Sequence, residues 1–515
     1  MQIESTALEE ALLHIEHRGD TDIFPLPFEF LAIRHSWQSI RQLFLDCNPV
    51  DWAPRQSRQA LIPKGEFGFR LATQLDPMDS IFLTALVLQF ADKLEGARVP
   101  ISEKIVFSHR YSPGPRGQIF DPNCNYEAFR QRSLELAGFG SVSHVVITDI
   151  GDFYSRIYQH PLQNAIAEAT DDEVGHVFGR FFSRISSKAS HGIPIGPGVC
   201  RLLADLDIND IDFALKTESY VFCRYSDDFR IFARSEKEAR QALSFLAQTL
   251  YRNHGLTLQA SKTEILTRDE FLSKYGESDD SRAGQRFQQL QDQSIIFLSS
   301  PYQFVTWEDL DDEQKDNLIS ANLFSLFEEA LSQDPVDMRV ALFALRWLRL
   351  TSEESHVPFV LANLDTLYSI FPSVMDYLLK FAGAKPDQAT FATKILKLLE
   401  HQKVGVLDFH RELVLNPFTT QPDWNHMDDL IAIYNNHHDA PTRRAVILAL
   451  GTQKQSNWFK LKKHEASDMK EWEKRAFLFG ARCMARDEGD AWFSSVNPHL
   501  TELDRAVVKY AKFKR

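Results

Sequence analysis

The sequence predicts an α+β domain followed by an all-α helical domain, and three observations support this prediction. Two apolar runs with strand composition, at residues 145–148 and 220–233, lie in the first part of the chain. Beyond about residue 300, nearly all of the sequence has the period of an amphipathic helix and is interrupted by prolines. The 515 residues, 44% of them hydrophobic, are enough for two or three domains with their own cores.

Residues 220–233 are predicted to form a β-hairpin. Two apolar arms flank Tyr225-Ser226-Asp227-Asp228, so two carboxylates lie at the tip. Adjacent aspartates at a buried edge repel each other and resist desolvation, and a divalent cation held between them would offset both costs. Most acidic turns are only solvated loops, so the turn alone is weak evidence.

A third carboxylate follows the other predicted strand. Asp149 ends the run 145–148 and precedes a segment that is predicted to become helical at Phe153. An acidic residue at the end of a strand, together with an acidic hairpin, is the arrangement required for two-metal phosphoryl transfer. Asp149 and Asp227 would bridge the two ions, with Asp228 as a weaker ligand. Mg²⁺ is the expected ion because all of the candidate ligands are oxygen atoms.

With these residues, the chain resembles the reverse transcriptases over roughly residues 50–300. Residues 149–154 are similar to motif A of that family and residues 225–228 to motif C. Residues 191–198 resemble motif B, the glycine-rich loop beside the template and base pair, and residues 255–263 resemble motif D. The resemblance implies an α+β right-hand polymerase with fingers and a ferredoxin-like palm, and RNA-directed DNA polymerase activity, a nucleotidyltransferase reaction.

The resemblance also implies roles for single residues. Asp149, Asp227 and Asp228 would be catalytic and, with Ile150, would bind two Mg²⁺ ions, for which Mn²⁺ could substitute. Lys262 is similar to the general acid that protonates the departing pyrophosphate, a role for which its pKa would need to fall only modestly. Tyr154 would lie under the sugar and exclude a 2′-hydroxyl, so deoxynucleoside triphosphates are the expected substrates. The predicted substrate-binding set is Arg70, which resembles the arginine that grips the triphosphate, with Asp152, Phe153, Tyr154 and Gly196.

Two departures from the family pattern count against long templated copying. Ile195 stands where templated reverse transcriptases commonly carry a glutamine after the motif B proline. Basic residues that are frequent in bacterial relatives are missing around Met78-Asp79-Ser80. Neither departure touches the chemistry of nucleotide addition.

The helical part contains three similar segments, at residues 339–345, 444–450 and 475–481, each of which begins with an arginine. Paired helices stacked in a HEAT-like repeat would explain them, and an irregular helical bundle is the alternative. The predicted organisation is an N-terminal helical extension over residues 1–50, fingers and palm over 51–300, and an α-helical repeat domain over 301–515. A polar loop at residues 277–293 is expected near the last boundary.

A reverse transcriptase domain followed by a helical repeat resembles the prokaryotic abortive-infection and defence-associated reverse transcriptases. Residues 19–25 and the Gly-Ile-Pro-Ile-Gly-Pro form of motif B are similar to that group. This resemblance implies an anti-phage enzyme, often a homo-oligomer, that makes single-stranded DNA without ordinary template copying and in some cases on a protein hydroxyl. Some relatives instead require a noncoding RNA.

Protein priming would need a mobile tyrosine that can enter the active site. Tyr510, in the basic carboxyl-terminal segment, is the candidate, although a packed helix aromatic is the alternative explanation. Two other functions remain open. One is a conventional RNA-templated reverse transcriptase of retron or intron type, and the other is a non-catalytic scaffold.

The overall composition limits the partners and the compartment. A net charge of −14 favours a local basic channel over a broad nucleic-acid-binding surface. The five cysteines are scattered, without the spacing of a zinc site or a disulfide framework, which is typical of a reduced, cytoplasmic protein. No apolar run is long enough to span a bilayer, so no membrane partner is expected.

Overall fold

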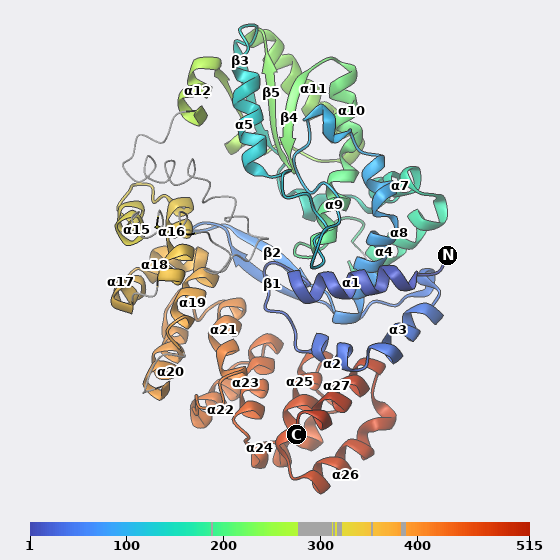
Figure 1. Ribbon diagram of the computed structural model, residues 1–515, viewed down its shortest axis with the longest axis vertical. Coiled ribbons are helices and arrows are strands. Elements are labelled where there is room, and N and C mark those ends of the chain that lie inside the picture. The colour runs from blue at the N-terminus through green and yellow to red at the C-terminus, as the bar shows by residue number, and fades with distance from the viewer. Residues whose placement is uncertain (187–188, 277–311, 313–314, 317–321, 352–353, 383–387) are drawn as a thin grey trace. The chain divides into compact units, whose positions relative to one another are not determined.

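The computed structural model describes residues 1–186, 189–276, 312, 315–316, 322–351, 354–382 and 388–515. These residues belong to two compact units. Figure 1 shows the chain coloured by residue number. The first unit comprises Met1–Leu26, Arg41–Arg58 and Ala72–Ser278, and the second comprises Pro27–Ile40, Gln59–Leu71 and Asp279–Arg515. The predicted domain boundary near residue 300 and the polar loop at residues 277–293 lie outside the described residues.

A four-stranded antiparallel sheet forms the centre of the first unit. Its strand order is β4 (Val221–Tyr225), β5 (Asp228–Ala233), β3 (His144–Asp149) and β6 (Glu264–Thr267). The strand predicted before Asp149 and the predicted hairpin are therefore confirmed. Val145 and Val146 are both fully buried although successive side chains of a strand point to opposite faces, so both faces of this sheet are covered.

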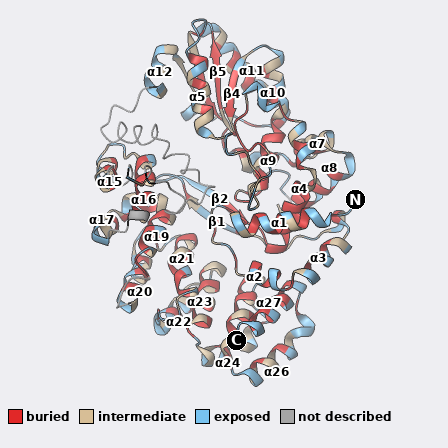
Figure 2. Ribbon diagram, in the orientation of Figure 1, coloured by how far each residue is buried: buried red, intermediate tan, exposed pale blue. Residues whose placement is uncertain are grey.

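Three helices account for most of this cover. The helices α5 (Tyr126–Ala137) and α12 (Arg268–Gly276) share an apolar cluster with Val145 and Phe232 of the sheet. The long helix α11 (Glu236–His254) packs against β3, β5 and β6. Figure 2 shows the buried residues of the strands between these helices.

The helix α4 (Pro77–Gly96) is buried over most of its length. It starts where the sequence provides a cap, because the side chain of Asp76 accepts a hydrogen bond from the Met78 amide at 3.0 Å and Pro77 fits the first helical position. Every residue from Pro77 to Leu88 is buried. The remaining helices of this part of the chain are α1 (Ser5–Arg18), α2 (Glu29–His35), α3 (Trp37–Asp46), α6 (Phe153–Arg156), α7 (Gln159–Ala169), α8 (Asp172–Ile185), α9 (Gly198–Asp207) and α10 (Asn209–Thr217).

Residues 1–50, predicted as an N-terminal helical extension, form α1 to α3 and are divided between the two units. The strands β1 (Arg58–Pro63) and β2 (Phe69–Gln74) form a separate two-stranded sheet.

Apart from these strands, the described elements of the second unit are helices. Successive helices pack in series, α16 against α19, α19 against α21, α21 against α23, α23 against α25 and α25 against α27. The three similar segments of the sequence lie in α16, α23 and α25, the last one continuing by one residue past the end of α25. The helix bounds are α15 (Leu323–Leu331), α16 (Met338–Thr351), α17 (Val357–Ala362), α18 (Leu364–Leu367), α19 (Phe371–Leu379), α20 (Gln388–Leu396), α21 (Asp408–Leu415), α22 (Met427–Asn436), α23 (Ala440–Thr452), α24 (Ser456–Lys462), α25 (Glu471–Gly480), α26 (Arg486–Val496) and α27 (Glu502–Phe513).

Two of the three segment-opening arginines meet a single buried glutamate. Both guanidinium ends of Arg444 bind the Glu29 carboxylate, at 2.8 and 2.6 Å, and Arg475 Nε lies 3.3 Å from Glu29 Oε1. Burial alone would raise the pKa of Glu29, but the charges of Arg444 and Arg475 outweigh it and hold this pKa below its usual value. The third arginine, Arg339, is 79% exposed and pairs with Asp337, so the three segments differ in what they bind.

No single helix of the described residues is long and apolar enough to cross a membrane. One pair, Glu354–Ala362 with Leu364–Leu379, reaches the required length and composition only when taken together across a bend of 78°.

Candidate functional site

The three predicted catalytic aspartates lie at one end of the central sheet. Asp149 is the last residue of β3, Asp228 is the first residue of β5, and the two are register partners. Asp227 lies in the two-residue turn before β5, and its backbone carbonyl accepts a hydrogen bond from the Ile150 amide at 3.1 Å. The antiparallel pairing thus brings a strand end and a hairpin turn together, as the sequence predicts.

The three carboxylates lie within one another's electric field. Burial, and then the negative charges of Asp227 and Asp149, raise the pKa of Asp228 to about 7. Asp149 itself is 7% exposed, while Asp227 and Asp228 are half-buried. Such a group of partly buried like charges is unfavourable on its own and attracts cations.

One cation of the chain already contacts this group. Lys262, at the end of the 3₁₀ helix η3 (Ala260–Lys262), places its Nζ atom 2.5 Å from Asp149 Oδ2. Backbone hydrogen bonds support this position, because the Gln259 amide donates to the Asp149 carbonyl at 2.7 Å and the Gly151 amide to the Thr257 carbonyl at 2.9 Å. Motif D is therefore attached directly to the end of β3.

The pKa of Lys262 differs from the expectation of a modest fall. Burial lowers it, but the hydrogen bond and charge of Asp149, together with the charges of Asp228 and Asp227, outweigh burial and raise it. The physical reason is that the nearest partner of the amine is a carboxylate. Lys262 is consequently held in its protonated form.

Three of the predicted substrate-binding residues, Asp152, Phe153 and Tyr154, lie at the start of the short helix α6 (Phe153–Arg156) after β3. Phe153 is buried at 2% exposure, while Tyr154 is half-buried and packs edge-on against it, with ring centroids 5.5 Å apart. Asp152 is exposed and adopts a left-handed backbone conformation with a φ of 51°. Its Oδ2 atom lies 3.7 Å from Nη2 of Arg156. Phe153 is thus a core residue, and Tyr154 is the member of this pair that is open to a ligand.

The glycine-rich loop of motif B is joined to α6 by its backbone. The Ile193 amide donates to the Tyr154 carbonyl at 3.0 Å, and the Gly192 amide donates to the Ile157 carbonyl at 2.8 Å. Farther along the loop, the Ile195 carbonyl accepts a hydrogen bond from the Thr73 amide at 2.8 Å. These bonds fix the loop beside Tyr154, as a binding site for the nascent base pair would require.

Gly196 in this loop has a steric reason to be glycine. Its φ of 141° is rarely adopted by other residues, and a Cβ atom would lie 2.8 Å from the Thr73 carbonyl oxygen and 3.1 Å from Thr21 Cγ2. Both neighbours belong to the same unit as the loop. The structure therefore places Gly196 in a close backbone contact.

We expect Gly196→Ala to destabilise the protein by about 1–3 kcal/mol, because the methyl group must displace the Thr73 backbone and occupy a strained φ. Thermal unfolding of the variant measures this loss. Gly198→Ala is the matched control, since its Cβ atom would meet nothing closer than 3.6 Å. Equal stability of the two variants would contradict the steric account.

Comparison with known proteins gives one family match, which covers part of the chain. Residues 117–301 match the family model described as reverse transcriptase (RNA-dependent DNA polymerase). The chain contains a reverse transcriptase domain. The matched range includes the three aspartates, the motif B loop and Lys262. The reverse transcriptase domain makes this protein a nucleotidyltransferase of the RNA-directed DNA polymerase family.

Solved telomerase structures share a distant overall likeness with the chain. Telomerase from Candida albicans, in complex with the TWJ fragment of telomeric RNA, is 10% identical, with a TM-score of 0.33 over 79% of this chain and 71% of that chain. Apo telomerase from Candida tropicalis is 13% identical, with a TM-score of 0.32 over 70% of each chain. A search of curated proteins gave no match. The family match to residues 117–301 supports a reverse transcriptase domain and does not point to the abortive-infection group.

Reverse transcriptases generally use divalent metal ions, usually Mg²⁺. The carboxylates of Asp149, Asp227 and Asp228 and the backbone carbonyl of Ile150 supply hard oxygen donors, which suit that ion. Among the described residues, no three acidic, histidine or cysteine side chains are arranged to hold an ion as they stand. Lys262 occupies Asp149 Oδ2, so its amine would compete with a metal ion for that oxygen. The donor set fits Mg²⁺ in kind.

The raised pKa of Asp228 predicts a pH-dependent stability in the presence of a chelator. Ionising the Asp228 carboxyl costs more free energy in the folded than in the unfolded protein. The contribution of Asp228 to the free energy of unfolding therefore falls as the pH rises from about 4 to about 7, and it is constant above that range. Asp228→Asn should therefore be more stable than the wild type at pH 8 by about 1–3 kcal/mol and lose this advantage near pH 4. Urea denaturation with EDTA at both pH values measures the difference. Asp269→Asn, at a site 84% exposed, is the control and should show no such trend.

Two predicted residues lie in the second unit. Arg70 is an exposed residue of β2, and its proposed contact with the triphosphate remains a prediction. Tyr510 belongs to α27, is 7% exposed, and stacks on Phe479 with centroids 5.6 Å apart. The flexible tail expected around Tyr510 is instead a helix that begins with a capping box, so use of Tyr510 as a primer would require α27 to open.

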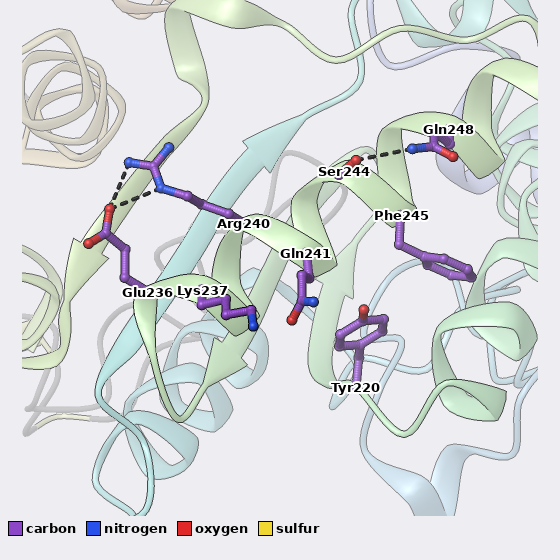
Figure 3. Close-up of a pocket in the computed structure, with 8 residues that line it drawn as sticks. All are labelled: Tyr220, Glu236, Lys237, Arg240, Gln241, Ser244, Phe245 and Gln248. Atoms are coloured by element: carbon purple, nitrogen blue, oxygen red, sulfur yellow. Dashed lines mark hydrogen bonds and ion pairs between the residues drawn. The ribbon is translucent and has the colours of Figure 1, made fainter.

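A shallow groove runs along the outer face of α11, and Figure 3 shows its side chains. The lining includes an ion pair between Glu236 and Arg240 and a hydrogen bond between Ser244 and Gln248. None of the predicted site residues lines it. The groove is therefore not part of the candidate site.

Sequence analysis missed a group of buried charged residues behind the hairpin. Arg224 of β4 and two aspartates, Asp205 of α9 and Asp212 of α10, are all fully buried. The available signal was the charge of Arg224 inside a predicted apolar strand, since a charged residue is buried in such a position only when it is paired.

Proposed function

We propose that this protein is a metal-dependent polymerase that adds deoxynucleotides at Asp149, Asp227 and Asp228. The observation that carries the proposal is the β3–β5 register, which sets Asp149 opposite Asp228 within the reverse transcriptase domain. Two Mg²⁺ ions held there, with Mn²⁺ as a substitute, would supply charge neutralisation of the phosphates and activation of the attacking hydroxyl.

The remaining chemistry is assigned to the residues around the carboxylates. Lys262 is protonated and lies at the edge of the group, where it can donate its proton to the leaving pyrophosphate. The Phe153 ring packs against the Tyr154 ring, and the Ile193 amide donates a hydrogen bond to the Tyr154 backbone carbonyl. A ring fixed in this way suits a steric filter for the 2′-hydroxyl of an incoming nucleotide.

Tyr154→Ala tests this filter. We expect the preference for deoxynucleotides over ribonucleotides to fall by about 10- to 100-fold, because the discrimination is steric and the variant removes the ring. Incorporation of each nucleotide class under matched conditions measures the ratio. Tyr154→Phe keeps the ring and should keep the preference, and an unchanged ratio in both variants would count against the assignment.

We further propose a role in anti-phage defence, with template-independent synthesis of single-stranded DNA by a homo-oligomer. Ile195, in place of the usual glutamine, supports the template-independent reaction. The segment 19–25, similar to that of the defence group, lies next to Gly196 of the motif B loop, where an added Cβ atom would meet Thr21 Cγ2 at 3.1 Å. Its Asp22 also pairs with Arg201 of α9 at 2.7 Å. The serial packing of α16 to α27 supports a HEAT-like repeat. Phage plaque counts on cells expressing the wild type or Asp227→Asn test the role, and equal protection by both would favour a scaffold without catalysis.

RNA-templated synthesis is the second candidate function. It is favoured by the matched family, which is described as RNA-dependent DNA polymerase. Incorporation of labelled deoxynucleotides with Mg²⁺, with and without an RNA template and primer, separates the two reactions. Product formed without added nucleic acid supports template-independent synthesis, and protease sensitivity of a protein-bound product would support protein priming. Product formed only with RNA supports the templated reaction or the use of a noncoding RNA.

A further inference from the structure

A network of buried charges lies directly behind the catalytic hairpin. Arg224 makes two hydrogen bonds to the Asp212 carboxylate, each 2.7 Å long, and its Nη1 atom lies 2.5 Å from Asp205 Oδ1. On the other side, Arg98 Nη2 lies 3.3 Å from Asp205 Oδ2. The side chains of all four residues are at most 1% exposed, so two carboxylates and two guanidinium groups are removed from water together.

This network reaches the turn that carries Asp227. Arg224 Nη1 donates a hydrogen bond to the Ser226 carbonyl at 3.1 Å. The Ser226 amide donates to Ser108 Oγ at 2.8 Å, and that hydroxyl donates to Asp205 Oδ1 at 2.9 Å. Both backbone groups of the residue that precedes Asp227 are therefore bound to one connected set of side chains.

The conformation of Ser226 shows why such support is needed. Its φ of 54° lies in the left-handed region, which is unfavourable for a residue other than glycine. Strained backbone of this kind persists only where surrounding contacts determine it fully. The hydrogen bonds from Arg224 to the Ser226 carbonyl and from the Ser226 amide to Ser108 are such contacts.

Stability alone is a poor explanation for the network. Taking several ions out of water is costly, and well-packed apolar side chains of similar volume stabilise a core equally well or better. Apolar side chains, however, offer no hydrogen bonds to the amide and carbonyl of a strained turn. The charged residues supply both.

We propose that Ser108, Asp205 and Arg224 are positioning residues that hold the Ser226 turn so that Asp227 and Asp228 can bind a divalent cation. This inference rests on the metal-dependent function proposed above. Ser108 is the most specific position to substitute, because its hydroxyl joins the Ser226 amide to the Asp205 carboxylate.

The test compares Ser108→Ala with a matched control, Ser133→Ala. Ser133 is also fully buried in the same unit and donates a hydrogen bond to the Phe129 carbonyl at 2.6 Å. Its hydroxyl lies 3.4 Å from Cys223 Sγ on β4, but Ser133 belongs to none of the hydrogen bonds described above between Ser226, Ser108, Asp205 and Arg224. The probe is Mn²⁺ alone, with binding to the full-length protein followed by electron paramagnetic resonance, and thermal unfolding is recorded for each variant. We expect Ser108→Ala to bind Mn²⁺ about 10-fold more weakly than the wild type, as is typical when a group that supports a metal ligand is removed. Ser133→Ala should bind as the wild type does, even where it loses as much stability.

Two further variants complete the design. Ser108→Thr retains the hydroxyl and should restore most of the affinity. Ser108→Cys fills a similar space with a thiol, which hydrogen-bonds only weakly. It replaces the alanine variant if that variant does not fold, and it should likewise bind Mn²⁺ more weakly than the wild type.

The outcomes separate the inference from the function on which it rests. If the wild type binds Mn²⁺ more tightly than Asp227→Asn, but Ser108→Ala and Ser108→Cys bind like the wild type, the positioning role is wrong and the metal site stands. If the wild type and Asp227→Asn bind Mn²⁺ equally, the proposed metal site is wrong and the positioning role is lost with it.

Discussion

Asp227→Asn is expected to reduce deoxynucleotide incorporation by about 10³-fold or more while leaving the protein folded. Asparagine has nearly the shape of aspartate but lacks the negative charge that binds a divalent ion. Each loss of about 1.4 kcal/mol in transition-state stabilisation slows the reaction about tenfold. The fold should tolerate the change, because Asp227 repels Asp228 and its charge contributes to the raised pKa of that residue. Single-turnover incorporation at saturating Mg²⁺ measures the rate, and circular dichroism checks the fold.

Asp269→Asn serves as the control for this prediction, since it removes the same charge from a site that is 84% exposed on α12. It should retain wild-type activity. A folded Asp227→Asn protein with activity within tenfold of the wild type would show that the hairpin aspartate is not a metal ligand.

Glu29→Ala is expected to have the largest effect on stability, about 3–5 kcal/mol in the second unit. The variant leaves the guanidinium groups of Arg444 and Arg475 buried without their shared carboxylate, and an uncompensated buried charge is strongly destabilising. Tryptophan fluorescence during urea denaturation measures the loss, because Trp472 lies beneath both arginines, with its ring centroid 5.1 and 4.8 Å from their guanidinium carbons.

Arg339→Ala is the control for Glu29. Arg339 occupies the same position in its segment as Arg444 and Arg475, but it is 79% exposed, so its loss should cost no more than about 1 kcal/mol. Equal losses of stability in Arg339→Ala and Glu29→Ala would contradict the claim that the buried ion pairs of Glu29 contribute more to stability than the exposed ion pair of Arg339.

The local features of the catalytic region were predictable from the sequence because each depends on neighbouring residues. Apolar runs bounded by Asp149 and by the Tyr225-Ser226-Asp227-Asp228 turn specify strands and a hairpin through their composition. The pairing of Asp149 with Asp228 then agrees with the prediction that their carboxylates share a site.

Long-range ion pairs were not predictable, because a sequence gives residue types and not partners. Nothing local links Lys262 to Asp149, Arg224 to Asp212, or Glu29 to Arg444. In each case the pairing depends on how helices and strands from distant parts of the chain pack. The sequence shows that a position in an apolar segment is charged, but it does not show which residue is its counterion.

The sequence leaves two interpretations of Tyr510, a mobile primer and a packed helix aromatic, and its priming role stays a prediction. The basic residues near it suggest a mobile tail, but Leu503, Val507, Tyr510 and Ala511 recur at helical spacing and are all buried. Exposed lysines on the opposite face of an amphipathic helix are compatible with a packed aromatic ring. The apolar stripe, rather than the charge, determines where Tyr510 lies.

The most direct test of the central claim is Mg²⁺-dependent incorporation of labelled deoxynucleotides by the purified wild-type protein. The protein is first stripped with EDTA, and Mg²⁺ is then titrated back, with and without an RNA template and primer. The account predicts no product without the ion, product that rises with Mg²⁺ in at least one of the two conditions, and none with Asp149→Asn. Incorporation that continues without a divalent ion, or that survives Asp149→Asn, would contradict it.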